Sequence, residues 1–260
     1  YKSSLETFLA RLGKPFFIDP VTYIFARPID LMLREEGDVK RSFTKLLSLY
    51  GTQLAEIILE QVRALSPEDF ITKGSWNDSL IEDLCRNVMA FQRKFAVKEK
   101  MPTLEWLMGL AEQKIVLKQP VLLSLVAPYF YAESRVDKWY RISLELARRA
   151  AQMEGRVDVY PVICLSKQVL LFDDVVRKVV EDYKGFNGVL IWISDLQDDR
   201  DGVAYLKGVA KFVKAFAEMK RAVYSLYGGY FFSLLTKIGL TGFSSSICYG
   251  ESKHVDSRAT

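Results

Sequence analysis

The sequence predicts an α/β protein, a TIM-like (β/α)8 barrel that is incomplete and carries a helical insertion after its first strand. From residue 118 onward, apolar segments alternate with amphipathic segments at intervals of roughly twenty to forty residues, as in parallel strands joined by helices. No G-x-G-x-x-G follows the first apolar segment, so the fingerprint of a dinucleotide-binding Rossmann fold is missing. About six strands can be counted where a closed barrel needs about eight. We expect truncation at the C-terminus to explain the missing strands most simply.

Length and composition fit one barrel-sized domain. The chain has 260 residues, 50% of them hydrophobic and 26% charged, with a formal net charge of +4. A charge this small does not by itself indicate a nucleic-acid partner, although it would not repel phosphate. No run of about 18 uninterrupted apolar residues exists, so we expect no membrane span.

The cysteines and the histidine limit the chemistry. Cys85, Cys164 and Cys248 are far apart, lie in apolar segments and form no C-x-x-C pair. This pattern is typical of reduced, buried thiols in a cytoplasmic protein. The sole histidine, His254, lies in a polar tail, so a metal site with several histidine ligands is excluded for this chain. A Ser-His-Asp triad would have to use the same residue.

The first part of the chain divides into a barrel segment and a helical segment. Residues 1–29 hold a short amphipathic helix at 5–12 and the first strand at 15–18, which stops at Asp19-Pro20 because proline cannot continue a central strand. Residues 30–117 read as helices with apolar side chains at spacings of three and four. Helices are predicted to open near Ser66 and near Pro102. A segment this long is no connecting loop, so we expect a helical insertion or subdomain.

Residues 118–260 supply the βα repeats of the barrel. The predicted strands are 121–131, 157–165, 188–194, 221–226 and 243–248. The predicted helices are 134–153, 173–183, 201–219 and 230–238. Pro161 lies inside the second of these strands, where it removes a backbone hydrogen-bond donor.

Charged residues at strand ends are the candidate chemical groups, because barrel enzymes place catalytic groups there. Asp195 directly follows strand 188–194 and could be nucleophile, base or metal ligand, or part of a solvated acidic loop. Asp19 and Glu251 are the other candidate catalytic acids; Asp19 could instead make only an Asx turn, and Glu251 only a solvated loop. Glu133 could line the site or favour a helix N-terminus. Lys167 could form a Schiff base or hold phosphate, with a surface lysine as the plainer alternative.

Glycines and aromatic residues mark the expected substrate-binding region. Gly228-Gly229 precedes a helix, where backbone N–H groups could hold an anion, or where a tight turn needs positive φ. Tyr227 and Tyr249 flank the last two predicted strands and are candidate binding residues. Aromatic side chains at strand ends could stack on a base or simply fill the core. These are Tyr129, Phe130, Tyr131, Tyr227, Tyr230, Phe231 and Phe232.

The strand-end aspartates Asp19 and Asp195 and the pair Gly250-Glu251 resemble barrels of the tRNA-guanine transglycosylase type. The resemblance covers about residues 15–25 and 121–252. It implies base exchange with an aspartate nucleophile and a second aspartate as general acid/base. The family's zinc cluster, with C-x-C-x-x-C spacing, is absent from this sequence, and we expect any such zinc site outside it.

Three functions are therefore expected from the sequence. The first is an enzyme acting on a nucleobase, nucleic-acid, nucleotide or other phosphorylated substrate by base exchange or glycosidic-bond chemistry. Asp195 would be nucleophile, Asp19 general acid/base and Glu251 a substrate-orienting group. The second is a non-catalytic barrel that binds a protein partner through residues 30–117. The third is a hydrolase using Mg²⁺ on the carboxylates Asp19, Glu133, Asp195 and Glu251.

Overall fold

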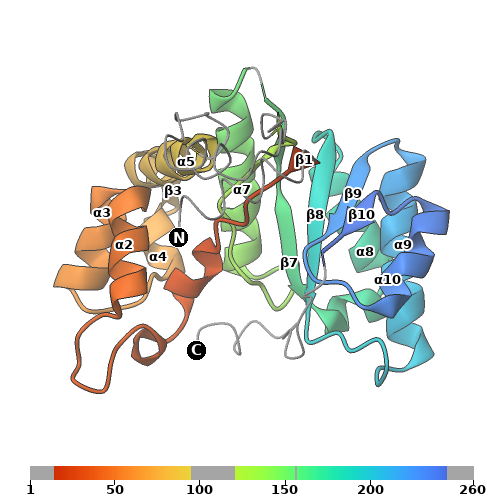
Figure 1. Ribbon diagram of the computed structural model, residues 1–260, viewed down its shortest axis with the longest axis horizontal. Helices are drawn as coiled ribbons and strands as arrows, with labels where there is room; N and C mark the ends of the chain where they lie inside the picture. Colours follow the sequence, from red (N-terminus) through yellow and green to blue (C-terminus); the bar gives the residue numbers. More distant parts are fainter. Residues whose placement is uncertain (1–14, 95–120, 156, 245–260) are drawn as a thin grey trace, which may run out of the picture.

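The computed structural model describes residues 15–94, 121–155 and 157–244. It is an α/β protein whose sheets are parallel apart from one short hairpin. Figure 1 shows strands β7 to β10 from the centre to the right, with α8, α9 and α10 outside them and helices α2 to α5 on the left. The predicted helices at 5–12 and 101–113 lie outside the described residues. Among the described residues, no helix is long and apolar enough to cross a membrane.

The parallel strands follow one another in chain order. Strand β1 (Pro15–Phe16) pairs with β4 (Val121–Leu122), and β5 (Leu125–Val126) pairs with β6 (Val159–Tyr160). Strand β7 (Val162–Ser166) pairs with β8 (Gly188–Ser194), which pairs with β9 (Ala222–Ser225) and then β10 (Gly242–Phe243). A parallel bridge between Ala132 and Leu165 joins the segment after β5 to β7. Sequential, parallel order is the arrangement that βαβ units generate.

Side chains from non-adjacent strands meet on one face of this sheet. The rings of Phe17, next to β1, and Tyr224, on β9, lie 5.8 Å apart between centroids. Tyr224 also stacks on Tyr160 of β6 at 6.1 Å. Gly188 of β8 approaches the same ring so closely that a Cβ atom there would lie 2.4 Å from Tyr160 Cζ. The sheet therefore curls, because otherwise β1 and β9 could not share neighbours.

Three amphipathic helices cover the other face. They are α7 (Lys138–Met153), α8 (Asp173–Tyr183) and α9 (Val203–Glu218), and each buries an apolar side at helical spacing. The 3-10 helix η4 (Lys167–Leu171) precedes α8, and α10 (Tyr230–Leu235) with η5 (Thr236–Ile238) connects β9 to β10. The side chain of Asp137 caps α7 by accepting a hydrogen bond from the Trp139 backbone N–H at 3.0 Å.

The segment after β1 is mainly helical. It contains η1 (Thr22–Ala26), η2 (Ile29–Leu31), α2 (Arg41–Tyr50), α3 (Thr52–Ala55), the π-helical turn η3 (Glu56–Glu60), α4 (Pro67–Phe70), the hairpin β2 (Ile71–Thr72) and β3 (Ser75–Trp76), and α5 (Asp78–Arg93). Ser66 and Asp69 form the predicted capping box of α4. Gln92 of α5 hydrogen-bonds both backbone groups of Val126 on β5, at 2.8 Å each, so α5 packs directly on the parallel sheet. Its core is continuous with the core around the strands.

Most predicted elements are confirmed, and the largest differences are at two strands and one helix. The first strand ends early, at Phe16, and residues 245–248 of the predicted strand 243–248 lie outside the described residues. Helix α8 and strand β8 begin and end at the predicted residues. The predicted strand 121–131 is two short strands separated by Leu123 and Ser124, and Pro161 separates β6 from β7. The helix predicted from 134 begins later, at Lys138, because Asp137 provides its cap.

Candidate functional site

Asp19 lies at the C-terminal end of β1 and is held by groups from three parts of the chain. Its Oδ1 accepts hydrogen bonds from the Val21 backbone N–H and the Tyr129 hydroxyl, both at 2.9 Å. Its Oδ2 accepts one from the Tyr227 hydroxyl at 3.0 Å. The bond to Val21 is the predicted Asx turn, and it accompanies a left-handed Val21 with φ of 53°. The two tyrosines follow β5 and β9, so Asp19 faces the C-terminal ends of several strands.

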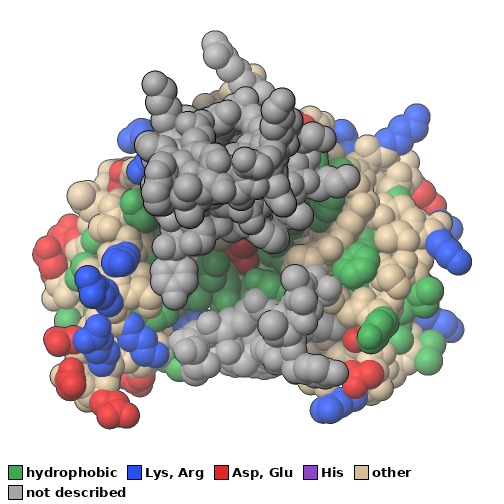
Figure 2. Space-filling view, viewed as in Figure 1, with side chains coloured by type: hydrophobic (Ala, Val, Ile, Leu, Met, Phe, Trp, Pro, Cys, Tyr) green, Lys and Arg blue, Asp and Glu red, His purple; other side chains and the backbone are tan. Residues whose placement is uncertain are grey.

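An aromatic wall surrounds this carboxylate. Trp192 of β8 lies edge-on to Tyr227 at 4.9 Å and to Tyr23 at 4.8 Å between ring centroids. Tyr129 stacks on Tyr23 at 5.9 Å and meets Trp192 at 6.4 Å. Tyr23, Tyr129 and Trp192 are buried and Tyr227 is partly buried. Figure 2 shows hydrophobic and acidic side chains at the centre of one face. We call Asp19, Tyr23, Tyr129, Trp192 and Tyr227 the Asp19 cluster.

The neighbours of Asp19 are held in their neutral forms. Burial, followed by the negative charge of Asp19, raises the pKa of the Tyr129 hydroxyl well above its usual value. The same two causes raise the pKa of the Cys164 thiol and of the Tyr50 hydroxyl. These hydroxyls therefore stay protonated and can donate hydrogen bonds, and such donors stabilise an ionised carboxylate. Cys164 is accordingly a neutral core residue rather than a nucleophile.

Helix α2 is tied to the residue that follows Asp19. The hydroxyl of Tyr50, the last residue of α2, donates to the Pro20 carbonyl at 2.8 Å. Its ring lies edge-on to Phe25 of η1 at 6.2 Å. The Asp19 cluster therefore has the parallel strands on one side and the start of the helical segment on the other.

Asp195, the predicted nucleophile, directly follows β8 and has an unusual backbone. Its φ is 64°, a left-handed conformation that costs free energy in a residue other than glycine. The Asp195 carbonyl accepts a hydrogen bond from Lys167 Nζ at 3.1 Å. Trp192, three residues earlier on the same strand, belongs to the Asp19 cluster. Asp195 and Asp19 thus lie at the same end of the parallel strands.

Lys167 is committed to an ion pair. Its Nζ lies 2.7 Å from Asp201 Oδ1, and both side chains are largely buried. Burial works against the charged lysine, but the hydrogen bond to Asp201 and the negative charges of Asp201 and Asp195 together outweigh it and raise the Lys167 pKa. A Schiff-base lysine needs the opposite shift. The predicted substrate-binding role therefore has less support than a structural role in tying η4 to the loop after β8.

The Gly228-Gly229 turn already holds an anion, and it is a side chain of this protein. The Asp198 carboxylate accepts a hydrogen bond from the Phe231 backbone N–H at 3.0 Å, at the start of α10. A Cβ atom on Gly229 would lie 2.2 Å from Asp198 Oδ2. Neither glycine has a positive φ, so the tight-turn alternative is wrong and close approach explains Gly229. An external anion would first have to displace Asp198.

Of the remaining candidates, Glu133 is described, and no described contact joins it to the Asp19 cluster. Glu133 is exposed, and next to burial its carboxylate raises the pKa of Tyr131. Glu251 and Tyr249 lie outside the described residues. Within the described ranges, no three His, Cys, Asp or Glu side chains gather closely enough to hold a metal ion. The three described carboxylates of the magnesium alternative therefore do not form the cluster that it needs.

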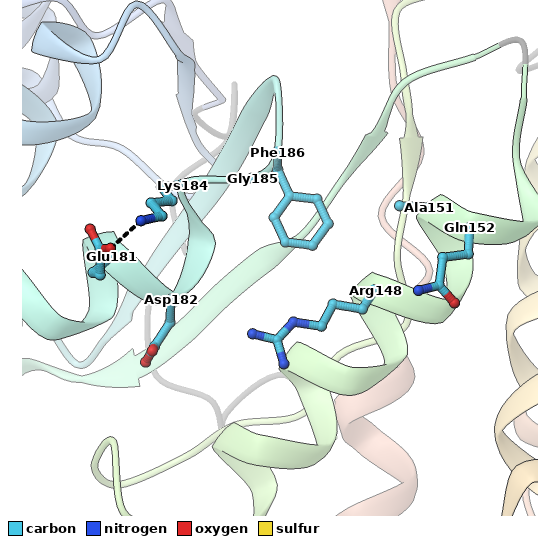
Figure 3. Close-up of a pocket in the computed structure, with 8 residues that line it drawn as sticks. All are labelled: Arg148, Ala151, Gln152, Glu181, Asp182, Lys184, Gly185 and Phe186. Atoms are coloured by element: carbon cyan, nitrogen blue, oxygen red, sulfur yellow. Dashed lines mark hydrogen bonds and ion pairs between the residues drawn. The ribbon is translucent and has the colours of Figure 1, made fainter.

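A second hollow lies between α7 and α8. Its volume is about 440 Å³ (Figure 3). Its lining residues are Arg148, Ala151, Gln152, Glu181, Asp182, Lys184, Gly185 and Phe186. Because β8 begins just after Phe186, the hollow lies at the N-terminal ends of the strands, away from Asp19. Lys184 pairs with Glu181 at the end of α8, and Asp182 pairs with Arg135 at 2.8 Å and accepts a hydrogen bond from the Tyr140 hydroxyl of α7, so these charges already have partners within the protein.

Trp192 and Tyr23 are neighbours of Asp19 that the sequence did not predict. Trp192 lies in an uninterrupted apolar strand, which looks like core throughout. The available signal was alternation, because residues 188, 190, 192 and 194 share one face of β8 and the last lies at the strand end. No comparable pattern points to Tyr23, because the sequence of η1 has no helical or strand periodicity.

No protein-family model, curated protein or solved structure matches this chain. Functional argument therefore rests on the geometry of the Asp19 cluster and of Asp195.

Proposed function

We propose that this chain is part of a (β/α)8-barrel enzyme that breaks or exchanges a glycosidic bond to a nucleobase. The observation that carries the proposal is the Asp19 carboxylate, held by the Tyr129 and Tyr227 hydroxyls beside Trp192 at the C-terminal ends of the strands. Sequential parallel order and the curled sheet support the barrel. Barrel enzymes carry their chemistry at this end of the strands.

Each part of the site has a task in this chemistry. Asp195 is the nucleophile: its carboxylate oxygen bonds to the sugar C1′ as the bond from C1′ to the base nitrogen breaks. Asp19 enters this step protonated and gives its proton to the departing base nitrogen, and the Tyr129 and Tyr227 hydroxyls stabilise the carboxylate that remains; Asp19 then takes a proton from the incoming base or water. Water or a second base then attacks C1′ and releases Asp195. Tyr227 is the partly buried aromatic residue of the cluster, and a nucleobase can stack on its ring, since stacking on aromatic side chains contributes about 1–3 kcal/mol per base.

A covalent intermediate tests the role of Asp195. Wild-type protein is mixed with labelled oligonucleotides and denatured rapidly, and a protein–sugar adduct is sought by gel and mapped by mass spectrometry. We expect an adduct on Asp195 that Asp195→Asn abolishes, with unfolding stability close to wild type. An adduct on another residue, or turnover by Asp195→Asn, would contradict the assignment.

One observation favours the second function, a non-catalytic binding or scaffold component. Asp19 joins β1 to residues 110 and 208 positions away through hydrogen bonds, which is also what a structural clasp would do. Under that alternative, Asp19→Asn lowers the free energy of unfolding. Partner binding through residues 30–117 then weakens only to the extent that the protein unfolds. Loss of turnover without loss of stability separates the enzyme from the scaffold.

A further inference from the structure

We propose that Lys167 is a positioning residue for Asp195, and that it acts by holding the loop after β8 in one conformation. This loop, residues 195–201, is called the β8 loop below. The inference rests on the proposed function, in which Asp195 is the nucleophile. The β8 loop carries four aspartates, and two of them, Asp198 and Asp201, are engaged in contacts that fix the loop.

Lys167 and Asp195 lie side by side because of the register of two strands. Ser166, the last residue of β7, pairs with Ser194, the last residue of β8. The next residues along each strand are therefore neighbours, and Lys167 Nζ donates a hydrogen bond to the Asp195 carbonyl at 3.1 Å. The same ammonium lies 2.7 Å from Asp201 Oδ1. One side chain thus joins the first and the last residue of the β8 loop.

The Asp201 carboxylate closes the loop through its other oxygen. Asp201 Oδ2 accepts a hydrogen bond from the Gln197 backbone N–H at 2.7 Å, and the Gln197 carbonyl accepts one from the Asp201 backbone N–H at 2.8 Å. The Lys167 and Asp201 side chains are only 19% and 11% exposed. Water therefore screens their attraction little, and removal of the lysine would leave a largely buried carboxylate without its cation.

The backbone of Asp195 determines where its carboxylate points. Residues 188, 190, 192 and 194 share the face of β8 that carries Trp192. One more extended residue would point its side chain to the opposite face, toward the helices and away from the Asp19 cluster. The left-handed φ of 64° at Asp195 ends this alternation, and Leu196 is buried directly after it. The direction of the nucleophile therefore depends on a backbone turn that costs free energy.

The hydrogen bond from Lys167 stabilises this turn and leaves the carboxylate of Asp195 available. It engages the Asp195 carbonyl, so it restrains the backbone rather than the side chain. No group in the described ranges donates a hydrogen bond to the Asp195 carboxylate, whereas the Asp198 carboxylate is bound at the start of α10 and the Asp201 carboxylate by Lys167. The contacts of the β8 loop thus separate one reactive acid from two acids that hold the loop.

Hydrogen exchange tests the holding of the loop without any substrate. Backbone amide exchange of residues 195–201 is followed by mass spectrometry in the whole wild-type protein and in Lys167→Met, which removes the ammonium and keeps an apolar stem. The lost contacts are hydrogen bonds from a charged group, so the β8 loop should exchange about 10–150-fold faster in the variant. Asp201→Asn breaks the same ion pair from the other side and should also accelerate exchange, so the test does not depend on one variant folding.

The matched control is Lys211→Met. Lys211 of α9 pairs with Asp173 at the same distance of 2.7 Å, but both side chains are exposed, and their printed hydrogen bonds are to each other rather than to the β8 loop. The β8 loop should exchange at the wild-type rate in this control. Wild-type exchange in Lys167→Met and Asp201→Asn, or equal acceleration in Lys211→Met, overturns the inference.

Single-turnover kinetics separate positioning from a purely structural role. With saturating labelled oligonucleotide, Lys167→Met should form the Asp195 adduct about 100-fold more slowly, because a misplacement of about 1 Å has an effect of this size. The half-saturating oligonucleotide concentration should stay at the wild-type value. If the β8 loop opens and the adduct still forms at the wild-type rate, the positioning inference fails and the proposed function stands. If the loop opens as expected and wild type never forms an adduct, the proposed function fails, and only the holding of the loop by Lys167 stands.

Discussion

Replacing Tyr227 with phenylalanine removes one hydroxyl donor from Asp19 and keeps the ring against Trp192. The lost interaction is a 3.0 Å hydrogen bond to a carboxylate, and bonds to charged groups contribute about 1.5–3 kcal/mol. The 4.9 Å contact between the rings of Tyr227 and Trp192 should remain. We therefore expect Tyr227→Phe to lower the free energy of unfolding by about 1.5–3 kcal/mol.

The assay is urea unfolding at pH 7, followed by circular dichroism. Tyr224→Phe is the matched control, because Tyr224 lies three residues earlier and no described group hydrogen-bonds its hydroxyl. That control should change stability by less than about 0.5 kcal/mol. In an Asp19→Asn background, Tyr227→Phe should cost less, with a coupling energy of about 0.5–2 kcal/mol. Equal losses for Tyr227→Phe and Tyr224→Phe would refute the account of how Asp19 is held.

Three further predictions follow from other parts of the structure. The Asp182 carboxyl is partly buried, yet its ion pair with Arg135 lowers its pKa. The stability that this ion pair contributes is present at neutral pH and is lost as pH falls through the pKa of the folded state. In urea unfolding, Asp182→Asn should therefore lower the free energy of unfolding by about 1.5–3 kcal/mol at pH 7 and by less near pH 3. Gly229→Ala should lower stability by about 1–3 kcal/mol, since its Cβ would displace the capping carboxylate, whereas Gly185→Ala, which points into open space, should not. Burial raises the pKa of Cys85 to about 12, and the pKa of Cys164 well above its usual value, so peptide mapping should find both thiols unalkylated until urea unfolds the chain.

Local signals predicted most elements, and they failed at breaks and ends of elements. Strand β8 is a continuous apolar run and α8 opens with two aspartates, so both were readable from neighbouring residues. The split of the predicted strand 121–131 after residue 122 could not be predicted, because a single polar residue, Ser124, is compatible with a continuous strand. Helix 134–153 began late because the capping side chain, Asp137, outcompeted the earlier Ser134.

The site was predictable in position and not in partners. The strand-end rule pointed to Asp19, but its hydroxyl donors come from residues 110 and 208 positions away, which spacing cannot reveal. The same rule pointed to an anion at Gly229. An anionic group does lie at this helix N-terminus, but it is the Asp198 carboxylate from a neighbouring loop, which the sequence did not predict. The role of Lys167 likewise depends on its ion pair with Asp201, which lies 34 residues later and could not be predicted from spacing.

The rate of nucleobase release by Asp19→Asn shows whether Asp19 moves the proton in the reaction. Single-turnover release of the base from the labelled oligonucleotide is compared among wild type, Asp19→Asn and the control Tyr224→Phe. If Asp19 moves the proton, its loss should slow release by about 10²–10⁴-fold, while oligonucleotide affinity stays at the wild-type value and Tyr224→Phe keeps the wild-type rate. Release by Asp19→Asn at the wild-type rate would contradict the account, whatever its effect on stability.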